Sequence, residues 1–149
     1  MCYHAGIRHS TPDLVRIADL ELFADCAKAE LRQIDSLTTC LHVPADRVLM
    51  REGSTAKEFI IIGSGTARVS RETDGGAARV ADLGSGDFLG EIALLTGKRR
   101  TATVTATTDL AVFVSSASEF RSILHIAPSV ANKVVQTSMV RVASMDVAA

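Results

Sequence analysis

Hydrophobic residues recur at helical spacing near both ends of the chain and form short runs between them. Thr11-Pro12-Asp13 combines a preferred N-cap residue, a proline suited to the first helical position, and an acid that favours the helix dipole. Apolar residues follow at intervals of three or four, with Leu14 and Ile17 as the first pair. This pattern predicts helices over residues 12–37.

The middle of the chain, residues 38–115, carries short apolar runs separated by turn residues. Asp74-Gly75 lies between two of these runs and is typical of a β-hairpin. Because the runs recur at about ten-residue spacing with no helix between most of them, they predict an antiparallel sandwich or barrel. The expected strand cores are residues 41–43, 48–50, 59–62, 67–69, 79–81, 102–106 and 110–114.

Helical patterns return after the strands, and one short helix interrupts them. Glu91–Leu95 is too short for an ordinary helix and fits a single helical turn. Ser116 and Glu119 have the spacing of a capping box, and Pro128 suits the start of a last helix. These signals predict two C-terminal helices over residues 117–143.

The predicted fold is therefore mainly β, an antiparallel β-roll of the jelly-roll kind with N-terminal helices and two C-terminal helices. One domain is expected at residues 11–145, with the β-roll at 38–115. Residues 1–10 are expected to form a flexible extension and residues 146–149 a tail.

Composition supports a single domain of 149 residues with a sizeable core, since 47% of the residues are hydrophobic and 22% are charged. A formal charge of −1 argues against a general nucleic-acid binder. The longest strongly apolar run, Phe59–Ile62, is far too short for a membrane span. Met1–His4 lacks the basic start of a signal peptide, so a cytoplasmic location is expected.

Cysteine and histidine usage does not indicate a metal centre. The 3 cysteines are widely spaced with no CxxC motif, which suits a reducing compartment. Cys2, His4 and His9 have side chains that bind metals, but a loose N-terminus explains them better. His42 is the only histidine in the strand region, which argues against a metalloenzyme of the related cupin type. No cofactor and no enzymatic activity are expected.

The stretch from Gly86 to Val104 has the parts of an anion site beside a hydroxyl acceptor. Gly90 permits a close approach of the backbone, and the short helix after it offers unpaired N–H groups. Arg100 supplies a guanidinium that grips phosphate oxygens, whereas Glu91 suits sugar hydroxyls. The pattern indicates a sugar phosphate or nucleotide. The alternative is a surface ion pair between Glu91 and Arg100, with the glycines serving only as turns.

Two adjoining segments, Phe88–Leu95 and Arg100–Val104, resemble the phosphate-binding cassette of cyclic nucleotide-binding domains. Such domains occur in the catabolite activator protein, protein kinase A regulatory subunits and cyclic-nucleotide-gated channels. The resemblance extends over about residues 20–142 and implies the same β-roll fold.

The resemblance also implies roles for individual residues. Glu91, after Gly90, would accept a hydrogen bond from the ribose 2′-hydroxyl, and Arg100 would bind the cyclic phosphate. The remaining phosphate contacts would come from backbone N–H groups, those of Ile92, Ala93 and Ala102. The implied ligand is cAMP or cGMP.

Three further residues are candidates for the base pocket, and Thr101 bears on the base. A threonine at the position of Thr101 is associated in the family with cGMP, although channels that carry it take both nucleotides. Val80 and Leu89 are expected to face the base, with an ordinary core role as the alternative for Val80. Arg141 is expected either to cap the base or to be an exposed helical arginine.

The sequence thus predicts a cyclic nucleotide sensor whose C-terminal helices move on ligand binding and which acts on an unidentified effector in trans. The alternatives are a scaffold protein with another ligand or none, and a separated regulatory piece of a larger transcription factor, transporter or enzyme. Only Ser144–Ala149 follow the last helix, so DNA binding by this chain is not expected. The apolar last helix suggests a homodimer, or alternatively packs on its own roll. Arginine outnumbers lysine, which hints at a bacterial source.

Overall fold

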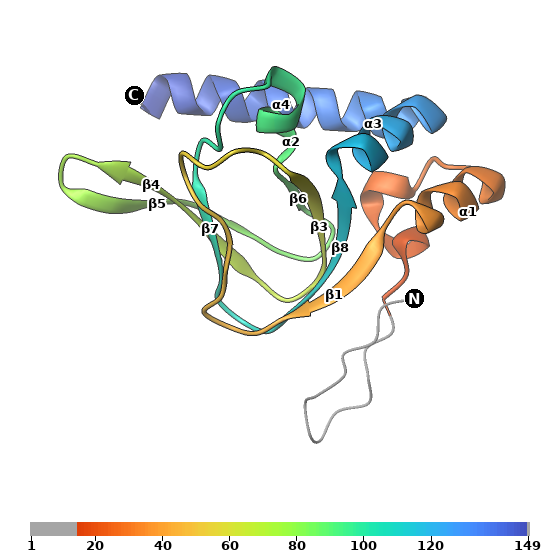
Figure 1. The fold of residues 1–149 in the computed structure, drawn as a ribbon, viewed down its shortest axis with the longest axis horizontal. Coiled ribbons are helices and arrows are strands. Elements are labelled where there is room, and N and C mark those ends of the chain that lie inside the picture. The colour runs from red at the N-terminus through yellow and green to blue at the C-terminus, as the bar shows by residue number, and fades with distance from the viewer. Residues whose placement is uncertain (1–14, 149) are drawn as a thin grey trace.

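The computed structural model describes residues 15–148, with side chains as far as residue 143, and confirms a mainly β fold flanked by helices (Figure 1). In this part of the chain, eight antiparallel strands form two four-stranded sheets with the orders β1-β8-β3-β6 and β2-β7-β4-β5. The strands are β1 (Thr39–Val43), β2 (Val48–Met50), β3 (Glu58–Ser64), β4 (Ala67–Thr73), β5 (Gly76–Leu83), β6 (Phe88–Leu89), β7 (Thr103–Ala106) and β8 (Leu110–Ser116).

Strand β3 shows why a continuous apolar run of this chain forms a strand. Phe59 and Ile61 face a core shared with the helices, whereas Ile60 and Ile62 face a second core between the two sheets. All four side chains are at most 3% exposed. A strand buried on both faces needs a continuous apolar run, and the run at 59–62 meets that need.

The N-terminal helices differ from the prediction. Within the described residues, two 3-10 turns, η1 (Ile17–Asp19) and η2 (Glu21–Phe23), precede a short α1 (Lys28–Ser36) in place of helices that begin at residue 12. The reason lies in the four large apolar residues of the two turns, which are all buried (Ile17, Leu20, Leu22 and Phe23). One continuous α-helix would spread these four over more than half of its circumference, too wide for one buried face, and the chain instead breaks at Leu20, which is extended. The Thr11-Pro12-Asp13 signal lies outside the described residues.

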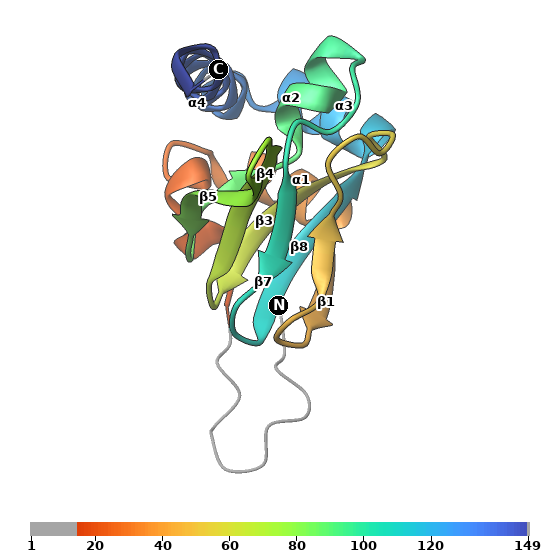
Figure 2. The ribbon, with the colours of Figure 1, turned by 90° about the vertical axis from the view of Figure 1, so that its left-hand side faces the viewer.

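The short helix and the C-terminal helices are confirmed, with one boundary corrected. Helix α2 (Glu91–Thr96) follows Gly90, and α3 (Ala117–Ile126) begins with the predicted capping box between Ser116 and Glu119. Helix α4 (Pro128–Ala148) continues beyond the predicted end at residue 143 and through most of the expected tail. It runs across one end of the roll, beside α2 and α3 (Figures 1 and 2).

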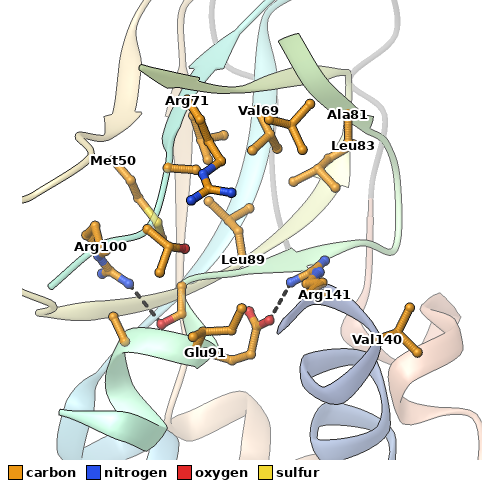
Figure 3. A pocket seen from close by; sticks show the side chains of 17 residues that line it. Met50, Val69, Arg71, Ala81, Leu83, Leu89, Glu91, Arg100, Val140 and Arg141 are labelled. Atoms are coloured by element: carbon orange, nitrogen blue, oxygen red, sulfur yellow. Dashed lines mark hydrogen bonds and ion pairs between the residues drawn. The ribbon is translucent and has the colours of Figure 1, made fainter. Parts of the chain in front are cut away.

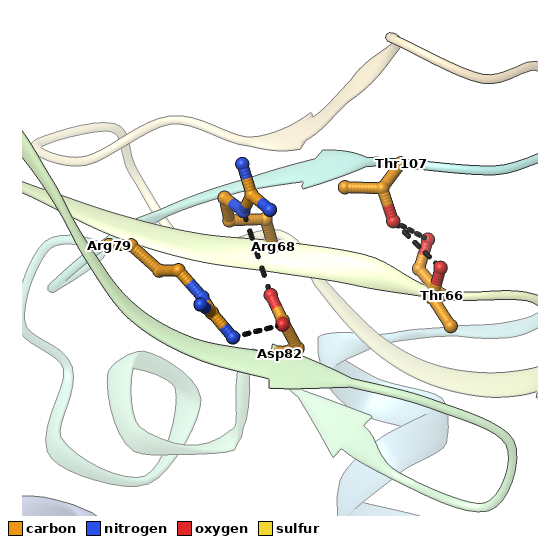
Figure 4. A network of polar contacts seen from close by, with 5 residues as sticks. All are labelled: Thr66, Arg68, Arg79, Asp82 and Thr107. Carbon is orange, nitrogen blue, oxygen red and sulfur yellow. Dashed lines mark hydrogen bonds and ion pairs between the residues drawn. The ribbon is translucent and has the colours of Figure 1, made fainter.

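Strands β4 and β5 form the hairpin predicted from Asp74-Gly75, with Thr73 opposite Gly76. On its outer surface Asp82 forms ion pairs with Arg68 and Arg79, all three largely exposed (Figure 4). Strand β5 lies at the edge of its sheet, and the hairpin extends beyond the rest of the roll (Figure 1). Strand β6, which pairs with β3, was not predicted because two residues give no readable alternation.

Candidate functional site

A cavity of about 290 Å³ lies between the roll, α2 and α4 (Figure 3). All ten residues singled out from the sequence line it, so the fold brings together side chains from β5, the cassette and the last helix. These residues are Val80, Leu89, Gly90, Glu91, Ile92, Ala93, Arg100, Thr101, Ala102 and Arg141. That they bind a ligand remains a prediction, which the geometry of the cavity supports as follows.

Gly90 forms the junction between β6 and α2, where the chain turns sharply. Its φ of 92° is in the left-handed region, and it serves as the N-cap of α2. A Cβ atom at this position would lie 2.5 Å from Met50 Cε, 2.6 Å from Arg100 Nη1 and 2.8 Å from the Glu58 carbonyl oxygen. Only glycine therefore allows the backbone to approach Arg100 this closely.

Arg100 lies against the wall of the cavity and is only 7% exposed. Its guanidinium donates from Nη1 to the Gly90 carbonyl at 2.8 Å and from Nη2 to the Glu58 carbonyl at 2.7 Å. Burial lowers the pKa of Arg100, while the carboxylates of Glu58 and Glu91 act in the opposite direction. A guanidinium stays protonated in proteins, and these bonds hold its charge in a fixed orientation with further N–H donors to spare.

Glu91 is 1% exposed and is the first residue of α2. Its Oε1 accepts a hydrogen bond from Arg141 at 2.6 Å, whereas its buried Oε2 has no hydrogen-bond partner among the described residues. A buried carboxylate oxygen without a donor is costly, so Glu91 has room for one more hydrogen bond. The ion pair of Glu91 is with Arg141 and not with Arg100, so the alternative of a surface Glu91–Arg100 pair is wrong.

Arg141 reaches from α4 toward Glu91 at the edge of the cavity (Figure 3). Besides its bond to Glu91, it donates from Nη2 to the Phe88 carbonyl at 2.7 Å, and its guanidinium carbon lies 5.0 Å from the centre of the Phe88 ring. Its side chain is 28% exposed. The alternative expectation, that Arg141 is simply an exposed arginine on the helix, is therefore wrong. Arg141 instead joins the last helix to the cassette.

Leu89 and Val80 form part of the apolar lining, with different exposure. Leu89 is 3% exposed and belongs to the core between the sheets. Val80 is 49% exposed at the rim of the cavity, so the alternative of an ordinary core residue is wrong for it.

The sequence pattern did not single out Arg71, Val69, Leu83 or Val140, which also line the cavity. Arg71 stands in the polar run Ser70–Thr73 near the hairpin, where it reads as a solvent-exposed strand residue. Strand alternation offered one signal, because Val69 and Arg71 are two residues apart and share a face of β4. The residues that face Val69 and Arg71 across the cavity come from α2 and α4, far along the chain. Strand alternation alone therefore could not show that this face of β4 lines a cavity.

The described part of the chain supports neither a metal site nor a membrane-spanning helix. The residues placed there bring together no group of three or more His, Cys, Asp or Glu side chains suited to a metal ion. None of the helices placed within residues 15–148 combines the length and apolar composition that a membrane crossing requires.

Comparison with known proteins assigns a family to this arrangement. The family model described as cyclic nucleotide-binding domain matches residues 40–126. The acetyltransferase Pat of Mycolicibacterium smegmatis is 35% identical over 133 residues, which cover 87% of this chain and 40% of Pat. A cAMP-dependent protein kinase regulatory subunit of Yarrowia lipolytica is 33% identical over 109 residues, which cover 72% of this chain and 28% of that subunit.

Solved structures agree. A mutant of the cAMP-binding acyltransferase from Mycobacterium smegmatis superimposes with a TM-score of 0.72 at 33% identity, covering 85% of this chain and 40% of that one. The catabolite activator protein of Thermus thermophilus has a TM-score of 0.75 at 24% identity, covering 85% and 60%, and shows the likeness of fold alone. This chain thus spans 40% or less of the length of the relatives Pat and the kinase subunit. Since the family model covers more than half of the sequence, the chain belongs to the family of cyclic nucleotide-binding domains.

Proposed function

We propose that this chain is a regulatory module that binds cAMP or cGMP in the cavity beneath α4. The observation that carries the proposal is the carboxylate of Glu91, which is 1% exposed and has one oxygen that receives no hydrogen bond from the part of the chain that the structure describes. A sugar hydroxyl supplies such a donor without bringing a charge. The oriented guanidinium of Arg100, on the same cavity, supplies the counter-charge for one phosphate.

The proposed pose follows from this division of the cavity. The cyclic phosphate lies at Arg100 and at the backbone N–H groups of Ile92, Ala93 and Ala102. The ribose 2′-hydroxyl donates to Glu91 Oε2. The base then extends along the wall formed by β4 and β5, whose apolar side chains suit a flat ring with little charge.

The position of α4 is proposed to depend on the ligand. Arg141 is bonded to the same carboxylate that is proposed to hold the ribose. A hydroxyl arriving at Glu91 changes the hydrogen bonds available to Arg141, and Val140 and Arg141 both line the cavity. The ligand therefore makes different contacts when α4 lies against the cassette and when α4 has moved. Such a difference in contacts is the condition for a ligand to shift the equilibrium between two positions of a helix.

We propose no catalytic role for the chain itself. Its output is the position of α4, read by an effector in trans or by a further part of a longer polypeptide, as the fused architecture of an acetyltransferase relative suggests. A second copy is the other proposed partner of α4, whose side chains Val135, Met139 and Val140 are 45%, 68% and 67% exposed. Scaffolding with another ligand or none is the alternative function.

Calorimetric titration of the purified chain with cAMP and cGMP tests the proposal. We expect saturable binding to one site with a dissociation constant in the micromolar range or tighter, which corresponds to about 8 kcal/mol. The linear nucleotides 5′-AMP and 5′-GMP serve as matched controls and are expected to bind at least about tenfold more weakly, because the second phosphate charge lacks a partner. Absence of binding by both cyclic nucleotides would support the scaffold alternative.

Hydrogen exchange tests the proposed link to α4. We expect saturating cyclic nucleotide to change the exchange rates of amides in residues 135–148 more than those in β3 or β8. Arg141→Met, which removes both of its hydrogen bonds to the cassette, is expected to raise exchange in this segment before any ligand is added. Identical exchange in all four samples, wild type and variant with and without ligand, would contradict the link.

A further inference from the structure

Arg71, on β4, places a guanidinium inside the cavity for which the proposed pose has no use (Figure 3). The side chain is half-buried. Among the residues that the structure describes, none forms a hydrogen bond or an ion pair with this guanidinium. An unpaired guanidinium partly removed from water is unfavourable unless a partner arrives, so Arg71 is poised to donate to a ligand.

The other two guanidiniums that line the cavity are already engaged. Arg100 is tied to the carbonyls of Gly90 and Glu58, and Arg141 to Glu91 and the Phe88 carbonyl. Arg71 therefore differs from both, since its whole planar fork of donors is available to whatever occupies the cavity.

The strand register gives the position of Arg71 in the cavity. Ser70 is opposite Thr103 in the pairing of β4 with β7, so Arg71 lies one residue beyond, toward Thr101 and Ala102. Arg71 also shares a face of β4 with Val69, which lines the same wall. If the phosphate is at Arg100 and the ribose at Glu91, this wall is the one that the base contacts.

We infer that Arg71 is a specificity-determining residue that donates hydrogen bonds to the base and makes the site prefer a 6-oxopurine, and so cGMP over cAMP. Guanine presents two neighbouring acceptors, N7 and O6, to which a guanidinium binds in bidentate fashion. Adenine presents N7 beside an N6 amino group, which is itself a donor. Because arginine has donors and no acceptor, it matches the first edge and opposes half of the second. The inference rests on the proposed function and adds a base preference to it.

Three ligands and two variants test this inference by calorimetry: cGMP, cAMP and inosine 3′,5′-cyclic monophosphate, with Arg71→Met and the control Arg79→Met. Inosine keeps N7 and O6 but lacks the 2-amino group, so it separates Arg71 from any contact between Thr101 and that group. Methionine keeps an apolar stem and removes every donor. Arg79 lies in the paired strand β5, is exposed, and does not line the cavity (Figure 4).

For the wild-type chain we expect cGMP and the inosine nucleotide to bind at least about tenfold more tightly than cAMP. Arg71→Met is expected to weaken both of these ligands by about 10- to 100-fold and cAMP by less than about threefold, so the preference is largely lost. Arg79→Met is expected to leave all three affinities within about twofold, because its guanidinium contacts none of them.

The possible failures are distinct. Equal weakening of all three nucleotides by Arg71→Met would overturn the inference, since it would place Arg71 at the phosphate. Tighter binding of cAMP than cGMP by the wild type would overturn it as well. Either result leaves the proposed function standing. Absence of binding of any cyclic nucleotide to the wild-type chain would instead overturn the proposed function, and the inference with it.

Discussion

The cassette and the outer half of α4 form two walls of one cavity, but they are held in different ways. In the cassette, Glu91 and Arg100 are at most 7% exposed, and the backbone of Arg100 is bonded to Gly53 and Ser54. Between Val135 and Val142, α4 exposes Val135, Met139, Val140 and Val142, whereas Ser138 is buried, and Arg141 forms hydrogen bonds to the cassette. A wall that is buried and bonded on several sides is suited to recognition, whereas a helix segment with largely exposed side chains is suited to respond.

Arg100→Ala gives the largest expected effect and tests the recognition half of this comparison. We expect cyclic nucleotide affinity to fall by about 2–5 kcal/mol, or about 30- to 5000-fold, because the phosphate loses its buried counter-charge. Calorimetry on the folded variant, checked by its thermal transition, measures the loss. Arg99→Ala is the matched control, since Arg99 is exposed and donates to the Gly53 carbonyl. Wild-type affinity in Arg100→Ala would contradict the proposed site.

Gly90→Ala tests how rigidly the cassette is built. The left-handed φ alone costs an L-residue about 1–2 kcal/mol, and the new Cβ would collide with Met50 and the Glu58 carbonyl, which adds about 1–3 kcal/mol. Gly86→Ala is the control, since Gly86 has a φ of 90° and no neighbour within 4 Å of the added atom. Denaturant unfolding is expected to show a clearly larger loss of stability for Gly90→Ala. Equal losses of unfolding free energy in the two variants would show that the cassette adjusts to the added Cβ atom and is not rigid.

The difference between the two walls also explains which residues of the site could be predicted from the sequence. The cassette is local, so Gly90, Glu91 and Arg100 could be read from one stretch of about fifteen residues. Strand positions were readable because alternation and turn residues act over a few neighbours. The hairpin at Asp74-Gly75 is the clearest case.

Features that depend on distant segments were harder to predict. Arg141 meets Glu91 across 50 residues of sequence, and the pattern of α4 alone gave no sign of that partner. Arg71 enters the cavity only because β4 pairs with both β5 and β7. The segment around Leu20 follows helical spacing, yet burial of its four large apolar residues favours 3-10 turns instead.

Arg141→Met is expected to have an intermediate effect and tests the responsive wall. The substitution leaves a buried carboxylate without its donor, so we expect a loss of about 1–3 kcal/mol in unfolding free energy. Because Arg141 is partly exposed and its helix can adjust, the loss is expected to be smaller than for Gly90→Ala. Met139→Gln, at an exposed position of the same helix, is the control and is expected to unfold as the wild type does. A loss larger than that of Gly90→Ala would show that this wall is as fixed as the cassette.

Arg79→Met is expected to have the smallest effect. Its ion pair with Asp82 is exposed on both sides, and such pairs contribute about 0–1 kcal/mol. Denaturant unfolding of this variant should therefore match the wild type within about 0.5 kcal/mol. A larger loss would mean that the outer face of the hairpin contributes to stability as the partly buried Glu91–Arg141 pair does.

The most direct test of the proposed site is a double-mutant cycle between Glu91 and the ribose 2′-hydroxyl. Calorimetry of cyclic nucleotide and its 2′-deoxy counterpart, on the wild type and on Glu91→Ala, supplies its four corners. We expect removal of the hydroxyl to weaken binding to the wild type about tenfold or more, because the buried Oε2 loses its donor, and to change binding to Glu91→Ala by less than about twofold. An equal loss in both proteins, or none in the wild type, would contradict the assignment of Glu91 to the sugar.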